Sequence, residues 1–146
     1  MLRLFTFIAL YVMLLFCPAN AGQNLFPSGD SSASGGPTAV FRAIEKGLSA
    51  GDVRLIAPWF SPTVPINVRG SAPGYYSANQ AGEVLRHFLA THKISSFTFT
   101  TIEEGENPFA TGAARLMAGG RFERIQLYVR LSRDKSGWVI TQFNIY

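Results

Sequence analysis

Apolar and polar residues alternate along the stretch from Phe122 to Leu131, and this alternation restricts the fold more than any other feature of the chain. A period of two is typical of a β-strand that buries one face and exposes the other. Ile125, Leu127 and Val129 fall on the apolar face, so other elements of the chain must cover that face. The sequence therefore predicts a sheet with one side packed against a core.

Three further stretches have strand character, namely residues 96–102, 110–118 and 138–146. Gly119 and Gly120 are expected to form a tight hairpin turn, and residues 134–137 provide the next turn. Consecutive strands that are joined by short turns pair antiparallel. Ile66 and Val68 suggest one more short strand earlier in the chain.

Helical patterns occur before these strands. Thr38 is expected to cap a first helix and Asp52 a second, shorter one, because their side chains can accept a hydrogen bond from a free backbone N–H. Ser77 and Gln80 have the spacing of a capping box, which predicts a third helix that ends at about His92. We therefore expect an α+β fold: a curved antiparallel sheet of four to five strands with about three helices packed on one face. One core is expected, formed by Phe41, Ile44, Leu48, Trp59, Leu85, Phe88, Ile125, Leu127 and Val129.

The N-terminal segment has the three parts of a secretory signal peptide. Arg3 precedes an apolar run over residues 4–17, and the Ala-Asn-Ala sequence at 19–21 provides the small residues of a cleavage site. The run is shorter than the roughly 20 apolar residues of a membrane-spanning helix. We expect cleavage before Gly22, and an uncleaved anchor or lipid attachment at Cys17 are the alternatives.

The chain is then expected to divide into a signal peptide (1–21), a flexible Ser/Gly-rich linker (22–37) and one folded domain (38–146). Such a protein is exported, to the periplasm or out of the cell, and meets a membrane only through the signal segment before cleavage. Because Cys17 is the only cysteine, the processed chain has no disulfide and no thiol nucleophile. Its small excess of basic residues is scattered along the chain, which predicts no nucleic-acid partner.

Residues that could perform catalysis or bind a metal are poorly placed for either. Apart from Glu45 and Glu83 in the expected helices, the carboxylates fall in the linker, at a helix cap, in turns or at the start of a strand, and none is placed convincingly inside a cavity. His87 and His92 are five residues apart, whereas two metal ligands on one helical face need a spacing of three or four. The sequence therefore predicts no catalytic residue, no metal site and no cofactor.

Tyrosines and arginines provide the one candidate binding set. Tyr75 and Tyr76 stand where a loop meets the third expected helix, and Arg115, Tyr128 and Arg130 lie on neighbouring strands. Both residue types bury area and donate hydrogen bonds, so such a surface can bind an anionic or glycan ligand, or another protein. The alternative is that the tyrosines pack at the rim of the domain and the arginines are ordinary charges on an exposed sheet face.

Residues 41–60, FRAIEKGLSAGDVRLIAPWF, contain a helical stretch, a Gly-Asp break and a second stretch that ends in Trp59 and Phe60. With the strands that follow, this segment resembles the nuclear transport factor 2-like superfamily, which includes ketosteroid isomerase-like and cystatin-like cone folds. More narrowly, YSANQAGEVLRHFLATHKISSFTF, RFERIQLYVRL and GWVITQFNIY are similar to a family of small exported bacterial domains of unknown function. The resemblance covers about residues 38–146. It implies a cavity between the sheet and the helices, in which enzymatic members place acids, bases or tyrosines.

These observations favour a non-enzymatic exported module that binds or assembles in the bacterial envelope. The alternative is a small-molecule enzyme, isomerase-like or hydrolase-like, that uses the cone cavity. The expected partners are a second copy of the chain, an envelope protein, or a small anionic or glycan ligand. The homodimer is expected through the outer sheet face, as in many relatives, because Phe122, Arg124, Tyr128 and Arg130 give that face the composition enriched in protein interfaces.

Overall fold

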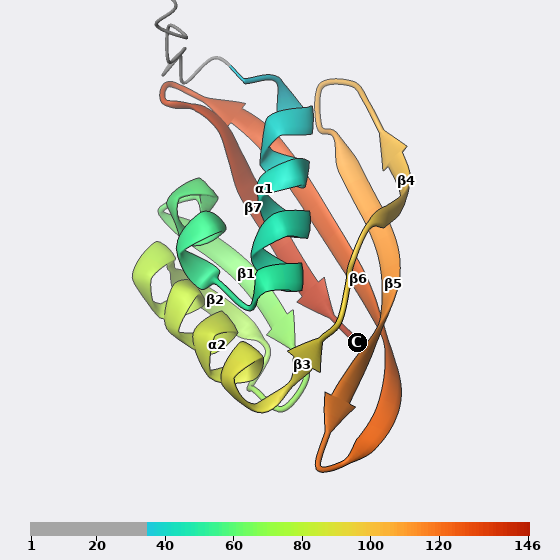
Figure 1. Ribbon diagram of the computed structural model, residues 1–146. Coiled ribbons are helices and arrows are strands. Elements are labelled where there is room, and N and C mark those ends of the chain that lie inside the picture. Colours follow the sequence, from blue (N-terminus) through green and yellow to red (C-terminus); the bar gives the residue numbers. More distant parts are fainter. Residues whose placement is uncertain (1–34) are drawn as a thin grey trace, which may run out of the picture. The chain divides into compact units, whose positions relative to one another are not determined.

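The computed structural model describes residues 35–146, and the strands in this part of the chain form one curved, open sheet (Figure 1). The sheet order is β2-β1-β7-β6-β5-β3, with β4 also paired to β5. All neighbours pair antiparallel except β1 and β7, which are parallel. The strands are β1 Thr63–Val68, β2 Gly74–Ser77, β3 Lys93–Ile94, β4 Phe99–Glu103, β5 Phe109–Ala118, β6 Arg121–Asp134 and β7 Gly137–Ile145.

Two α-helices, α1 (Pro37–Ala50) and α2 (Ala78–Thr91), cover one face of this sheet (Figure 1). Two 3-10 turns, η1 (Val53–Leu55) and η2 (Ala57–Trp59), stand where the second helix was expected. The predicted α+β class is confirmed, but the predicted count of four to five strands is too low. The additional strands β2 and β3 are too short to show an alternating pattern in the sequence.

The helix starts follow local chemistry, with one correction. The cap predicted at Thr38 is wrong: α1 begins at Pro37, which suits the first helical position because it has no N–H to satisfy and a fixed φ. Asp52 does cap, accepting the Arg54 N–H at 3.0 Å, although the segment that it starts is a 3-10 turn. The capping box between Ser77 and Gln80 is confirmed in both directions.

The predicted signal peptide (1–21) and the predicted linker up to residue 34 lie outside the described residues. The last residue of that linker, Pro37, already belongs to α1. Within residues 35–146, no helix combines the length and the apolar character needed to cross a membrane.

The space between the helices and the sheet is filled by apolar side chains. Eight of the nine residues predicted for the core are buried there. The exception is Trp59, which is partly buried and packs against the cluster. The two faces of β6 are assigned correctly, because Ile125, Leu127 and Val129 are buried whereas Arg124 and Arg130 are exposed.

Helix α1 also holds the segment that leads into β4. A Glu45 carboxylate oxygen accepts the Phe99 N–H at 2.7 Å, and the Ser49 hydroxyl oxygen accepts the Phe97 N–H at 2.9 Å. These contacts join parts of the chain that are about fifty residues apart. Glu45 therefore has a structural partner that no local pattern in the sequence indicated.

Candidate binding surface

The interior of the domain offers no acid or base where a cone cavity would lie. Among the described residues, the only polar side chains that are buried belong to Ser61 and Asn144. The Ser61 hydroxyl donates to the Thr63 carbonyl oxygen at 2.7 Å, and the Asn144 amide donates to the Tyr146 hydroxyl at 2.9 Å. The remaining buried side chains of this part are apolar, large rings such as Phe41 and Phe143 among them.

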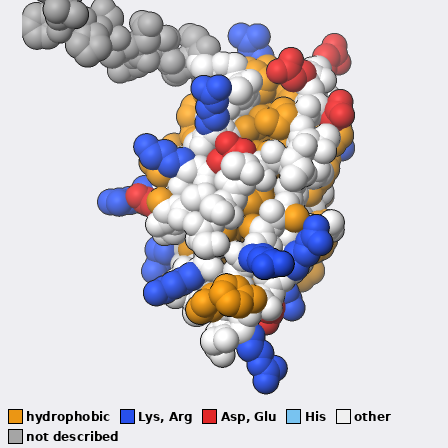
Figure 2. Space-filling view, turned by 45° about the vertical axis from the view of Figure 1, so that its right-hand side comes forward, with side chains coloured by type: hydrophobic (Ala, Val, Ile, Leu, Met, Phe, Trp, Pro, Cys, Tyr) orange, Lys and Arg blue, Asp and Glu red, His pale blue; other side chains and the backbone are white. Residues whose placement is uncertain are grey.

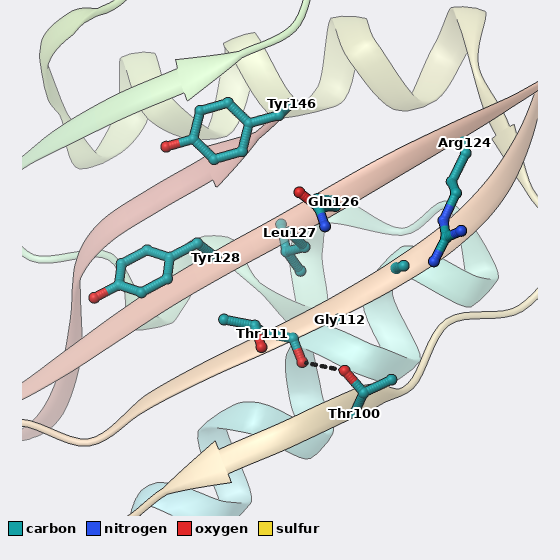
Figure 3. A pocket seen from close by; sticks show the side chains of 9 residues that line it. Thr100, Thr111, Gly112, Arg124, Gln126, Leu127, Tyr128 and Tyr146 are labelled. Carbon is teal, nitrogen blue, oxygen red and sulfur yellow. Dashed lines mark hydrogen bonds between the residues drawn. The ribbon is translucent and has the colours of Figure 1, made fainter.

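An open hollow lies instead on the outer face of the sheet, away from the helices, with a volume of about 450 Å³ (Figure 3). Small residues on β5, Thr111 and Ala113, leave this space between β4 and β6. Strand β6 provides the longer side chains, and the C-terminal residue borders the hollow from beyond β7. The lining residues are Thr100, Thr111, Gly112, Ala113, Arg124, Gln126, Leu127, Tyr128 and Tyr146.

Tyr128 is held at one end of the hollow by two neighbours on the same face. The Arg130 Nε donates a hydrogen bond to the Tyr128 hydroxyl at 3.0 Å. The Phe109 ring stacks on the Tyr128 ring, with 5.8 Å between centroids and an angle of 27° between planes. Tyr128 and Arg130 share a face because they are two residues apart on β6, and the register brings Phe109 to them because Phe109 lies opposite Arg130. The ring is therefore presented in a defined orientation.

Tyr146 borders the other side of the hollow. Its backbone N–H donates to the Gln126 carbonyl oxygen at 2.9 Å, and the Gln126 N–H donates back at 3.2 Å. Its hydroxyl accepts the hydrogen bond from Asn144, while 56% of the residue is exposed. The exposed Gln126 amide lies beside the two tyrosines, on the side towards Arg124 (Figure 3).

This arrangement suits binding better than acid–base chemistry. Arg124, Gln126 and the tyrosine hydroxyls can donate hydrogen bonds, and the rings offer flat apolar faces. No carboxylate or histidine is part of the lining. A polar, planar or anionic group, or a segment of another protein, fits such a surface.

The carboxylates with perturbed pKa values lie elsewhere on the surface. A hydrogen bond from Arg54 lowers the pKa of Asp52, and one from Arg86 lowers the pKa of Glu83. Hydrogen bonds from the Ser136 hydroxyl and N–H lower the pKa of Asp134. A lowered pKa keeps each group ionised near neutral pH, the opposite of what a general acid needs.

The histidines and Glu123 have structural surroundings. His92 stacks on Phe88 with ring centroids 4.4 Å apart, and His87 is exposed on α2. Glu123 forms an ion pair with Arg69 at 2.9 Å. Across residues 35–146, no three His, Cys, Asp or Glu side chains are grouped so that they could hold a metal ion.

The five residues of the predicted binding set do not form one constellation. Tyr128 and Arg130 are in contact, but Arg115 lies four positions from Thr111 along β5, about 13 Å from the place opposite Tyr128. Arg115 faces Arg124 instead.

Tyr75 and Tyr76 lie on β2. Strands β1 and β7 stand between β2 and β6 in the sheet. Tyr75 is 80% exposed, whereas Tyr76 packs against the core and donates its hydroxyl to the Ala72 carbonyl oxygen at 2.6 Å. The tyrosine pair is thus separated from the hollow, and any binding role of these residues stays a prediction.

Alternation along β6 places Gln126 on the same face as Tyr128, but sequence reasoning did not include it in the candidate binding set, and it missed Thr111 and Tyr146 as members of this surface. The signal for Thr111 was present: the turn at Gly119 and Gly120 fixes the register, and counting back from it places Thr111 opposite Tyr128. Tyr146 had no such signal, because its position depends on how β7 pairs with β6.

Residues 41–146 match the model of a family described as a domain of unknown function, DUF4783. The chain belongs to this family. Among curated proteins, none matches the chain in sequence.

Solved structures of other DUF4783 proteins share the fold. One from Bacteroides uniformis ATCC 8492 is 15% identical, with 71% of this chain and 93% of that chain covered and a TM-score of 0.62. One from Bacteroides fragilis YCH46 is 14% identical, with 70% and 93% covered and a TM-score of 0.60.

A ketosteroid isomerase-like protein from Erwinia carotovora atroseptica SCRI1043 is 13% identical, with 73% and 92% covered and a TM-score of 0.58. The expected nuclear transport factor 2-like fold is therefore confirmed for this DUF4783 domain. At these identities the likeness concerns the fold, which by itself does not define a function.

Proposed function

We propose that this DUF4783 domain is a non-enzymatic binding or assembly module, exported to the bacterial envelope, that works through the outer face of its sheet. One observation carries the proposal. The interior between sheet and helices is packed with apolar side chains, while the open hollow lies on the outer face and is lined by Tyr128, Tyr146, Gln126 and Arg124. A filled interior leaves the outer face as the place for recognition.

The enzyme alternative has less support from the described residues. A small-molecule enzyme of this fold would use a cavity that contains an acid, a base or another polar group aimed at the substrate. Here the two buried polar side chains, Ser61 and Asn144, are each hydrogen-bonded within the protein.

A second copy of the chain is the first occupant to test. In a symmetric dimer the same surface of both copies meets itself. The outer face provides the rings of Tyr128, Tyr146 and Phe109, with Arg124 and Arg130 close by. Aromatic residues and arginine are enriched in protein interfaces, whereas acidic residues are depleted.

We predict that Tyr128→Glu converts a dimer of the processed chain into a monomer. Glutamate would remove the ring that stacks on Phe109 and would place a carboxylate at the centre of the expected interface, where acidic residues are depleted. Sedimentation velocity measures the change, and circular dichroism checks that the fold is intact. Tyr75→Glu is the matched control, because Tyr75 is 80% exposed at the far edge of the sheet.

A wild-type chain that is monomeric at high concentration would rule out self-association. Capture experiments from envelope extract, with wild type and Tyr128→Glu side by side, then test the surface itself. An identical set of captured partners would contradict the proposal that this face binds another protein of the envelope.

Export is tested separately. We predict that the processed protein begins near Gly22, because the small residues at 19–21 follow a short apolar run. N-terminal sequencing of protein recovered from the envelope or the medium measures the start. A mature protein that starts at Met1 and stays in the membrane fraction would contradict cleavage, and lipid on Cys17 would support the lipoprotein alternative.

A further inference from the structure

The free end of the β5–β6 hairpin carries an exposed patch that adjoins the hollow and shares only Arg124 with it. Phe122 is 71% exposed and Met117 43% exposed, and the two lie directly opposite each other on β6 and β5. Lys93 on β3 lies opposite Met117 from the other side. The next pair along the hairpin on the same face is Arg115 and Arg124. We call these five residues the hairpin patch.

The cations of the hairpin patch lack acidic partners. The salt bridges of residues 35–146 involve Arg54, Arg69 and Arg86, and none involves a cation of the patch. Like charges directly opposite on neighbouring strands destabilise a sheet. The one carboxylate nearby along the chain, Glu123, is on the opposite face of β6 and pairs with Arg69. An external anion would remove the repulsion between Arg115 and Arg124.

Charge is segregated along the length of β5. Glu103, Glu104 and Glu106 are exposed at the end of β5 that is remote from the hairpin turn. The two ends of β5 are about 30 Å apart, because the strand has ten residues. In Figure 2 acidic side chains gather at the upper end, where some basic side chains also lie, and basic side chains surround an apolar patch near the lower end.

We infer that the hairpin patch docks the domain on the anionic headgroup surface of a lipid bilayer. Phe122 and Met117 would enter the interface between headgroups and acyl chains, while Lys93, Arg115 and Arg124 would contact the phosphates. The patch is at the tip of a hairpin that projects from the rest of the domain (Figure 1), so a flat surface can reach it. The acidic end of β5 then faces away from the bilayer. The sequence alone predicted no such membrane contact.

Co-sedimentation with vesicles tests this inference. The chain from Gly22 is suitable, because every residue of the core lies between Val40 and Ile145. We expect binding to an equimolar mixture of phosphatidylglycerol and phosphatidylcholine, weaker binding when salt is raised, and no binding to phosphatidylcholine alone. Removing both arginines in Arg115→Gln/Arg124→Gln should weaken binding roughly 25-fold, because each charge near the bilayer surface contributes about a fivefold factor in affinity.

Two matched controls separate the patch from the overall charge. Arg42→Gln/Arg133→Gln removes the same two charges from α1 and from the far end of β6, and should weaken binding much less. Phe122→Ser keeps the net charge and should weaken binding about tenfold through lost apolar burial. Tyr75→Ser removes an exposed aromatic residue at the far edge of the sheet and should have no effect.

Three results would overturn the inference: no binding of the wild type to the mixed vesicles, an equal loss in both double-arginine variants, or equal binding by Phe122→Ser and Tyr75→Ser. A dimer that Phe122→Ser dissociates, with vesicle binding unchanged, would likewise assign the patch to a second copy of the chain. Phe122→Ser changes no residue that lines the hollow, and Tyr128→Glu changes none of these five residues, so the two proposals can fail independently.

Discussion

Leu127→Ala is expected to lower the free energy of unfolding by about 2–5 kcal/mol, the usual range for truncating a buried leucine. Leu127 is 2% exposed at the middle of β6, where it lies opposite Gly112 on β5 and Ile145 on β7. Both neighbouring strands are part of the same hydrogen-bonded sheet, so they are poorly able to close around the cavity left by the lost side chain. Denaturant unfolding of the processed chain measures the change.

The neighbouring residue provides the control for this experiment. Gln126→Ala changes an exposed side chain on the same strand and should alter the free energy of unfolding by less than about 0.5 kcal/mol. If Leu127→Ala instead cost less than about 1 kcal/mol, the apolar face of β6 would not be packed against the helices as described.

The second large effect is expected from Gly112→Ala on β5. A Cβ atom at this position would lie 2.7 Å from the Phe97 ring and 2.8 Å from the Thr98 carbonyl oxygen. The ring belongs to the core, and the Thr98 backbone lies beside Phe97 and Phe99, which are held to α1 through Ser49 and Glu45, so neither can move freely. We expect a loss of about 1–3 kcal/mol, as for other overpacked cores, again measured by denaturant unfolding.

Gly74→Ala is the matched control for Gly112→Ala. Gly74 also lies in a strand, β2, and a Cβ there would meet its nearest neighbour, the Tyr76 ring, at 3.7 Å, which is an ordinary contact. This variant should keep or slightly raise stability, because alanine restricts the unfolded chain more than glycine does. Equal stability of the two variants would mean that Phe97 does not pack over Gly112.

Local sequence patterns determined the elements and their buried faces. The alternation along β6 places Leu127 inside and Arg124 outside because successive side chains of a strand point to opposite faces. The Ser77–Gln80 capping box marks the start of α2 through hydrogen bonds that span three residues. Each of these patterns spans only a few residues, so it can be recognised in the sequence without knowledge of the fold.

Only the tertiary structure decided which elements become neighbours. The parallel pairing of β1 with β7 joins Ile66 to Phe143, which are far apart in the sequence, and no short-range pattern encodes this choice. That pairing places two strands between Tyr75 and Tyr128 and so divides the predicted binding set.

The hollow itself depends on the same kind of long-range contact. The position of the hairpin turn is enough to predict that Thr111 lies opposite Tyr128. Tyr146, in contrast, reaches the hollow only through its backbone pairing with Gln126. The sequence by itself thus determined the buried and the exposed face of α1, α2 and β6. Which of the exposed side chains share one surface was decided by strand order and register, because these depend on contacts between distant segments that form together.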